Sequence, residues 1–173
     1  MTLITQEYKK QNEELHQVRK SYGANGHQNK SLVTRLVREY DCKDILDYGC
    51  GKADLDRSLN KWFKFYKVTN YDPAIPEYAD LPPLSDLVVC TDVLEHIEPE
   101  CLHDVLDHLK EVAKKIILIS IATHPAKKNL PDGRNAHLIQ EKIEWWMPKL
   151  RERFHVTKFW GNKDEFYAIC TTT

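Results

Sequence analysis

The chain has 173 residues, of which 42% are hydrophobic and 29% are charged, as is usual for a folded domain with one buried core. The formal net charge is −1, so the overall charge does not indicate binding to nucleic acid or to an anionic membrane. The charge is unevenly distributed: residues 1–120 carry 16 Lys/Arg and 20 Asp/Glu, whereas residues 121–173 carry 9 and 6. We expect one domain over residues 1–173 with a mildly cationic C-terminal part.

The five cysteines favour buried thiols over a disulfide framework or a zinc site. Their number is odd and no CxxC pair occurs, so we predict no metal site. The N-terminus lacks the apolar segment of a signal peptide, and no apolar run approaches the roughly 20 residues of a membrane span. We therefore expect a cytoplasmic protein without a membrane partner.

The first 40 residues predict two helices separated by a polar loop that contains Gly23 and Gly26. The apolar stripe of the first helix is sparse, and that of the second is denser at helical spacing. The two stripes are Tyr8, Leu15, Val18 and Tyr22, followed by Leu32, Val33, Leu36, Val37 and Tyr40.

Strands and helices alternate from residue 44 to residue 121. Four apolar runs, 44–48, 65–71, 86–91 and 116–121, are typical of strands, and helical patterns occupy 54–61 and 102–113. The alternation and the continuous apolarity of the later strands predict an α/β fold with a mostly parallel sheet covered on both faces. A helix near 143–150 and two strands, 154–160 and 165–170, follow; the strands flank Gly161-Asn162 and predict an antiparallel hairpin.

A glycine turn, Asp47-Tyr48-Gly49-Cys50-Gly51, joins the first buried strand to a helix. Glycines at such a turn allow the backbone to approach a ligand closely, although many α/β proteins use one only structurally. Asp54 stands where a dinucleotide fingerprint has its third glycine, and an acid there disfavours a pyrophosphate at the helix N-terminus. The turn therefore argues against NAD or FAD.

Acids follow the next two strands. Asp72 ends the second strand 21 residues after Gly51, the placement of an acid that accepts hydrogen bonds from ribose hydroxyls; the alternative is an Asp-Pro turn. Asp92 directly follows the strand 86–91. Parallel sheets bind ligands at the carboxyl ends of their strands, so Gly49, Asp72 and Asp92 are expected to meet at one edge.

DILDYGCGKADL, YDPAIPEY and SDLVVCTDVLEHIEP together resemble the successive motifs of class I S-adenosylmethionine-dependent methyltransferases. The resemblance implies a Rossmann-like methyltransferase fold, with residues 1–40 as a helical lid and residues 41–173 as the core. It implies S-adenosylmethionine as the cofactor and S-adenosylhomocysteine as the product. It places Asp47, Gly49 and Gly51 along the methionine part, Asp72 on the ribose, and Pro73 or Ala74 beside the adenine. Asp92, Val93 and Leu94 would close the pocket, and Tyr22 would fold over its methionine end.

One departure from the resembling family lies between the second strand and the DVLEHI strand, where only residues 73–85 remain. The fold is therefore expected to be abridged there by one strand with its helices. Asp80 is the predicted substitute contact for the adenine amino group.

His137 and His124 are the predicted catalytic residues, because they lie in the polar stretch after the fourth strand, where the acceptor is expected. A general base is needed only if the acceptor carries a proton that must leave. The stretch LPDGRNAHLIQ, followed by EWW, resembles compact bacterial and phage methyltransferases. We predict O- or N-methylation of a small polar molecule. A nucleic-acid or protein acceptor and a cofactor-binding subunit without transferase activity remain alternatives, and the oligomeric state is not predicted.

Overall fold

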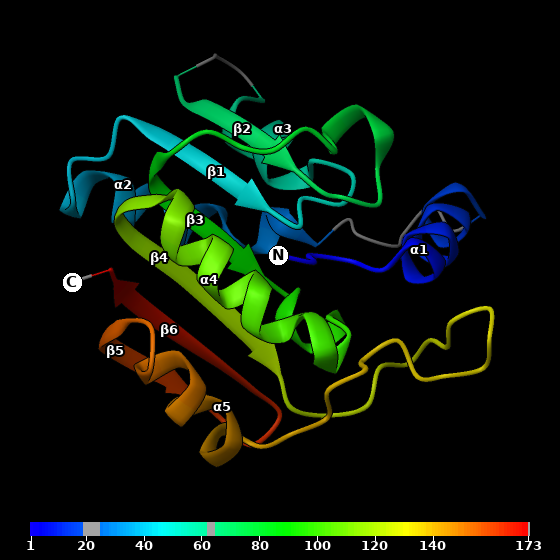
Figure 1. The fold of residues 1–173 in the computed structure, drawn as a ribbon. Helices are drawn as coiled ribbons and strands as arrows, with labels where there is room; N and C mark the ends of the chain where they lie inside the picture. Colours follow the sequence, from blue (N-terminus) through cyan, green and yellow to red (C-terminus); the bar gives the residue numbers. More distant parts are fainter. Residues whose placement is uncertain (19–24, 62–64, 173) are drawn as a thin grey trace.

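The computed structural model describes residues 1–18, 25–61 and 65–172. Its centre is a six-stranded sheet in the order β2-β1-β3-β4-β6-β5 (Figure 1). The first four of these strands pair in parallel, and β6 is antiparallel to both of its neighbours. The strands are β1 (Asp44–Tyr48), β2 (Lys67–Tyr71), β3 (Ser85–Thr91), β4 (Ala113–Ala122), β5 (His155–Gly161) and β6 (Glu165–Thr171). The predicted α/β class and C-terminal hairpin are thus confirmed.

Helices cover both faces of the sheet because the central strands are apolar on both sides. The helices α4 (Leu102–Val112) and α5 (Ile143–Arg151) pack on one face, the near face in Figure 1, where Trp146 is fully buried. On the other face lie α2 (Lys30–Glu39) and α3 (Asp54–Leu59), with Val33 and Leu36 fully buried against the sheet. Burying a large aliphatic side chain contributes roughly 1.5–3 kcal/mol, so these stripes hold the layers together.

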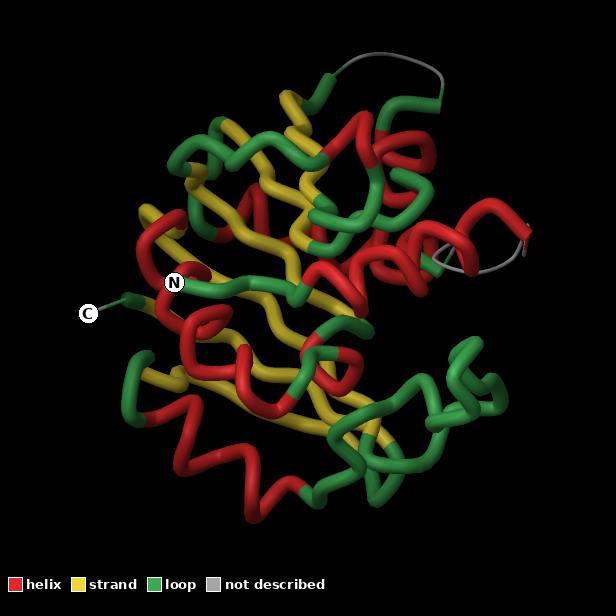
Figure 2. The backbone as a smooth tube through the Cα atoms, turned by 45° about the vertical axis from the view of Figure 1, so that its right-hand side comes forward, coloured by secondary structure: helices red, strands yellow, loops and turns green. Residues whose placement is uncertain are grey.

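The N-terminal 40 residues do not act together as a lid, because α2 belongs to the layer that covers the sheet. The apolar stripe of α2 packs against the sheet and so makes this helix part of the core. The helix α1 (Gln6–Val18) lies apart from the sheet instead (Figure 2). Its buried Tyr8 and Leu15 pack against Leu130 and Ala136 of the loop that follows β4. Among the described N-terminal residues, the segment from Met1 to the end of α1 and the residues 25–29 before α2 lie over the strand ends.

The connection from β2 to β3 is short, as expected. It contains a single-turn 3-10 helix (Pro76–Tyr78) and no further strand, so β2 is the edge of the sheet. The turn is closed by hydrogen bonds from the Asp72 amide to the Tyr78 carbonyl and from the Tyr78 amide to the Ile75 carbonyl. Among the described residues, no helix is both long and apolar enough to cross a membrane.

Candidate active site at the carboxyl ends of the strands

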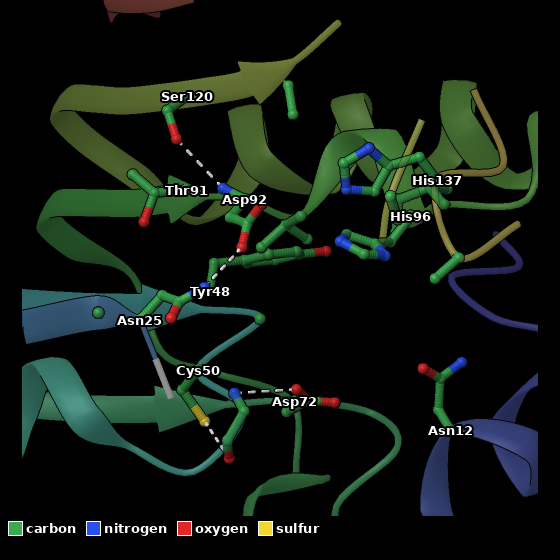
Figure 3. Close-up of a pocket in the computed structure, with 18 of the residues that line it drawn as sticks. Asn12, Asn25, Tyr48, Cys50, Asp72, Thr91, Asp92, His96, Ser120 and His137 are labelled. Carbon is green, nitrogen blue, oxygen red and sulfur yellow. Dashed lines mark hydrogen bonds between the residues drawn. The ribbon is translucent and has the colours of Figure 1, made fainter. Parts of the chain in front are cut away.

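A cavity of about 440 Å³ lies at the carboxyl ends of the parallel strands. Its lining comes from the turn after β1, the ends of β2, β3 and β4, the start of β6, the loop after β4, the N-terminal segment with α1, and residues 25–29. Figure 3 shows part of this lining. The volume falls in the range of small-molecule sites, and the position is where open parallel sheets bind ligands.

The glycine turn forms one wall. Gly49 has φ +75° and Gly51 has φ +51°, conformations that side chains adopt only with strain. The amides of Gly49 and Cys50 both donate to the Tyr71 carbonyl, at 2.7 and 3.0 Å, which ties the turn to the end of β2. A Cβ on Gly49 would lie 2.5 Å from Cγ2 of Val93. The turn therefore requires glycine for both conformation and space.

Asp72 is held rigidly at the end of β2 (Figure 3). Its Oδ2 accepts a hydrogen bond from the Gly51 amide at 3.0 Å, and its Oδ1 accepts one from the Ala74 amide at 2.9 Å. Each carboxylate oxygen can accept more than one hydrogen bond, so both can still receive hydroxyl groups. This geometry fits a sugar diol.

Asp47 is buried at the foot of the same turn. Burial, with added repulsion from Asp56, Asp72 and Asp54, raises its pKa to about 7. Asp54, by contrast, has hydrogen-bond partners: its Oδ2 accepts a hydrogen bond from the His27 amide at 2.9 Å and lies 2.5 Å from His27 Nδ1. These carboxyls disfavour an anionic ligand at the turn and favour a cationic one.

Asp92 follows β3 in a left-handed conformation, with φ +59°. Its amide faces the Ser120 carbonyl and Oγ at 3.3 and 3.2 Å, and Asn25 Nδ2 lies 3.5 Å from its carboxylate (Figure 3). A non-glycine residue with positive φ costs of order 1 kcal/mol and is frequent at functional sites. Its side chain is exposed to the cavity.

The acceptor-side histidines are placed unequally. His137 is buried, and its Nδ1 lies 2.5 Å from the His124 carbonyl oxygen. Because a carbonyl oxygen only accepts hydrogen bonds, Nδ1 carries a proton and is the donor. In the neutral ring with this tautomer, Nε2 is the nitrogen that carries the lone pair. The His96 ring packs edge-on against the His137 ring, with centroids 4.7 Å apart (Figure 3). The His124 side chain is exposed at the rim, with Nδ1 2.8 Å from the Pro125 carbonyl.

Asn135 positions the loop that carries His137. Its side-chain oxygen accepts hydrogen bonds from the amides of Ala126 and His137, both at 2.9 Å, and its Nδ2 donates to the Ala126 carbonyl. The polar loop after β4 is thus folded back onto the cavity by the Asn135 side chain together with a short backbone bridge between Asn129 and Asn135.

Glu95 was not among the predicted site residues. It is fully buried, and its Oε1 accepts a hydrogen bond from the Ala122 amide at 2.6 Å, while its carbonyl accepts one from the Ile139 amide. Burial and the neighbouring Asp92 carboxylate raise its pKa well above the usual value. The sequence signal for Glu95 is a charged residue that directly follows the apolar pair Val93-Leu94.

Most predicted residues line this cavity, and the structure places two of them outside its lining. Leu94 is fully buried in the core against the α4 side of the sheet, because the chain turns into a 3-10 helix there. Asp80 is exposed and outside the lining, because the Pro76–Tyr78 turn leads the chain away. Tyr22 lies outside the described residues. The lining includes Asp47, Gly49, Gly51, Asp72, Pro73, Asp92, Val93, His124 and His137.

The N-terminal segment roofs the cavity. Thr5 donates from its amide and hydroxyl to the Glu98 carboxylate, at 2.9 and 2.7 Å, and Tyr8 Oη donates to the His96 carbonyl at 2.6 Å. The amide of Thr2 also bonds to Asp104, at the start of α4. Burial raises the pKa of Tyr8 to about 12, so the phenol remains a donor. Together these bonds hold α1 over the strand ends.

The sheet order with its C-terminal hairpin, the glycine turn after β1 and the acids after β2 and β3 define a class I S-adenosylmethionine-dependent methyltransferase. A family model for a methyltransferase domain matches residues 15–164. The chain belongs to this family. No curated protein matches the chain in sequence.

Solved structures share the fold at low identity. The 1,6-didemethyltoxoflavin-N1-methyltransferase of Burkholderia thailandensis has a TM-score of 0.69 at 13% identity, covering 100% of this chain and 92% of that one. NodS, an N-methyltransferase of Bradyrhizobium japonicum, has a TM-score of 0.63 at 14% identity, covering 95% and 98%. The magnesium protoporphyrin IX methyltransferase of Synechocystis has a TM-score of 0.60 at 19% identity, covering 86% and 84%. All three were crystallised with S-adenosylhomocysteine.

Proposed function

We propose that the protein transfers the methyl group of S-adenosylmethionine to an oxygen or nitrogen atom of a small polar molecule. The observation that carries this proposal is one cavity with acids and a glycine turn on one side and a buried imidazole on the other. A cationic sulfonium cofactor suits the first side, and a polar acceptor suits the second. A dinucleotide would place its phosphates against Asp47 and Asp54.

The proposed cofactor-binding residues follow the three parts of the cofactor: methionine, ribose and adenine. The turn at Gly49 and the buried Asp47 receive the methionine end, where a carboxylate next to the cofactor's ammonium group would be stabilised in its charged form. Asp72 receives the ribose hydroxyls. The adenine then extends toward a second hollow of about 410 Å³, which shares Gly51 and Ala74 with the cavity and is lined further by Tyr78.

The acceptor lies on the side of the loop after β4. When bound, the cofactor supplies an activated methyl group, and the protein's task is to align the acceptor and exclude water, which lowers barriers by roughly 7–11 kcal/mol in favourable cases. His137 presents Nε2 from a fixed ring, and His124 contributes from the rim. The position of α1 over the cavity favours a small acceptor. One structural neighbour has 1,6-didemethyltoxoflavin bound, and another is named for magnesium protoporphyrin IX.

Cofactor-induced thermal stabilisation tests the cofactor side. We expect S-adenosylmethionine to raise the unfolding temperature of the wild type and of Asp80→Ala, and not that of Asp72→Ala. The two variants each remove one acid, but only Asp72 lines the cavity. Equal stabilisation of both variants would contradict the assignment of the ribose site.

Formation of S-adenosylhomocysteine with size-fractionated cell extract tests the acceptor side. We expect turnover with the low-molecular-mass fraction. Turnover with the macromolecular fraction alone would favour a nucleic-acid or protein acceptor, and binding of S-adenosylmethionine without turnover on any fraction would favour a cofactor-binding subunit.

A further inference from the structure

Three side chains in the cavity form a group suited to a metal ion. Asp92, His96 and His137 each offer one ligand atom, and these atoms lie within 4.8 Å of one another. Two come from the turn after β3 and one from the loop after β4, so the fold brings together residues far apart in the sequence (Figure 3). Ligands about 2.1 Å from an ion lie roughly 3.0–3.4 Å apart, so small side-chain rotations would close the group.

The hydrogen bonding of His137 is that of a metal ligand. Its Nδ1 donates to the His124 carbonyl, which fixes the ring and leaves Nε2 as the nitrogen available to bind a metal ion. Histidines that bind metals almost always donate their other ring N–H to a carbonyl or carboxylate in this way. The loop itself is anchored by Asn135, so the imidazole is positioned before any ligand arrives.

A second, independent observation is the buried Glu95 beside the group. Its side chain is fully buried and lies next to the Asp92 carboxylate. Among the residues that the structure describes, no donor is assigned to Glu95 Oε2, and the side chain within hydrogen-bonding reach of this carboxyl group is that of Asp92, another acid. Two adjacent carboxyl groups, one of them fully buried, are costly when both are charged, and a cation held by Asp92 would offset that cost.

We propose that Asp92, His96 and His137 bind a divalent first-row transition-metal ion, with the buried Glu95 carboxyl group behind Asp92. Two imidazoles with one carboxylate select such ions over Mg²⁺ and Ca²⁺, which prefer oxygen ligands. Three protein ligands leave positions open toward the cavity, where an oxygen or nitrogen atom of the acceptor would bind. In the metal-bound protein, His137 serves as a ligand and the ion polarises the acceptor.

Cobalt binding to the metal-free, full-length protein without cofactor tests this site. We expect one Co²⁺ per chain, with visible absorption bands and a higher unfolding temperature, and much weaker binding of Mg²⁺. Asp92→Asn and His137→Phe should each weaken Co²⁺ binding at least about 100-fold, because loss of a ligand exceeds the 10- to 100-fold effect of losing a supporting contact. His155→Ala, which removes an exposed histidine on β5, is the matched control.

Unchanged Co²⁺ affinity in both Asp92→Asn and His137→Phe, or no Co²⁺ binding by the wild type, would overturn the proposal. If His137→Phe fails to fold, Asp92→Asn decides the question, because its side chain is exposed and keeps its shape. Since the measurement contains no S-adenosylmethionine, its failure is distinct from failure of cofactor-induced stabilisation.

Discussion

Replacing Gly49 by alanine tests the reasoning about the glycine turn. Two costs are expected. The left-handed backbone, with φ +75°, costs roughly 1–2 kcal/mol for a residue with a Cβ. The new Cβ would also lie 2.5 and 2.9 Å from the two methyl carbons of Val93, and such overpacking costs typically 1–3 kcal/mol. The free energy of unfolding should therefore fall by about 2–5 kcal/mol.

A double-mutant cycle separates the two costs. Val93→Ala removes both methyl groups and leaves only Cβ, 3.3 Å from the new atom. In that background Gly49→Ala should cost only the backbone term, so the coupling free energy should be about 1–3 kcal/mol. Gly133→Ala is the control for the backbone alone, because Gly133 has φ +89° and a Cβ added there would meet no atom within 4 Å.

Urea unfolding of the cofactor-free variants, followed by circular dichroism, measures these free energies. A coupling below about 0.5 kcal/mol, or a Gly49→Ala cost no larger than that of Gly133→Ala, would refute the close contact with Val93. Gly49→Ala should also lose the thermal stabilisation by S-adenosylmethionine, because the same Cβ displaces the cavity wall.

Two further predictions concern Asp47 and Glu98. The pKa of Asp47 is raised to about 7 in the folded protein. Between about pH 4 and pH 7, the native state therefore binds more protons than the unfolded state. The free energy of unfolding consequently falls as the pH rises through this range. In unfolding experiments without cofactor, Asp47→Asn should remove up to about 4 kcal/mol of this fall in the free energy of unfolding. If the free energy of unfolding of the variant depends on pH as that of the wild type does, the raised pKa of Asp47 is contradicted. Glu98→Ala removes both acceptors of Thr5 and should loosen α1 by about 1–3 kcal/mol. Hydrogen exchange should then quicken in α1 and not in β3, whereas Glu100→Ala, an exposed neighbour, should leave α1 protected.

The strands could be predicted because their signal is local. The run at Asp44–Tyr48 and the fully apolar run within Ser85–Thr91 lie in the middle of the sheet, where both faces are buried, and their bounds match the expectation to within one residue. The edge strand β2 starts two residues later than expected, at Lys67, where only one neighbour constrains it.

Side-chain direction within a motif could not be predicted from order and spacing. The DVLEHI segment was correctly placed at the strand edge, but its turn sends Leu94 into the core and Glu95 under the cavity. The group of Asp92, His96 and His137 depends on a loop held by the Asn135 side chain, a contact with no periodic signal. Asp80 was misplaced for a related reason, because the turn at Pro76–Tyr78 is set by backbone bonds to Asp72 and Ile75.

Because the connection after β2 is short, α1 borders both ends of the proposed site. In the absence of a further strand, the second hollow beside Asp72 is bounded by the Pro76–Tyr78 turn on one side and by Glu13 and Gln17 of α1 on the other. The opposite end of the same segment roofs the acceptor side through Thr5 and Tyr8. One helix thus spans the adenine end and the acceptor end proposed for the site. Its docking to Glu98 would therefore affect cofactor and acceptor together, so loosening it should weaken both rather than either alone.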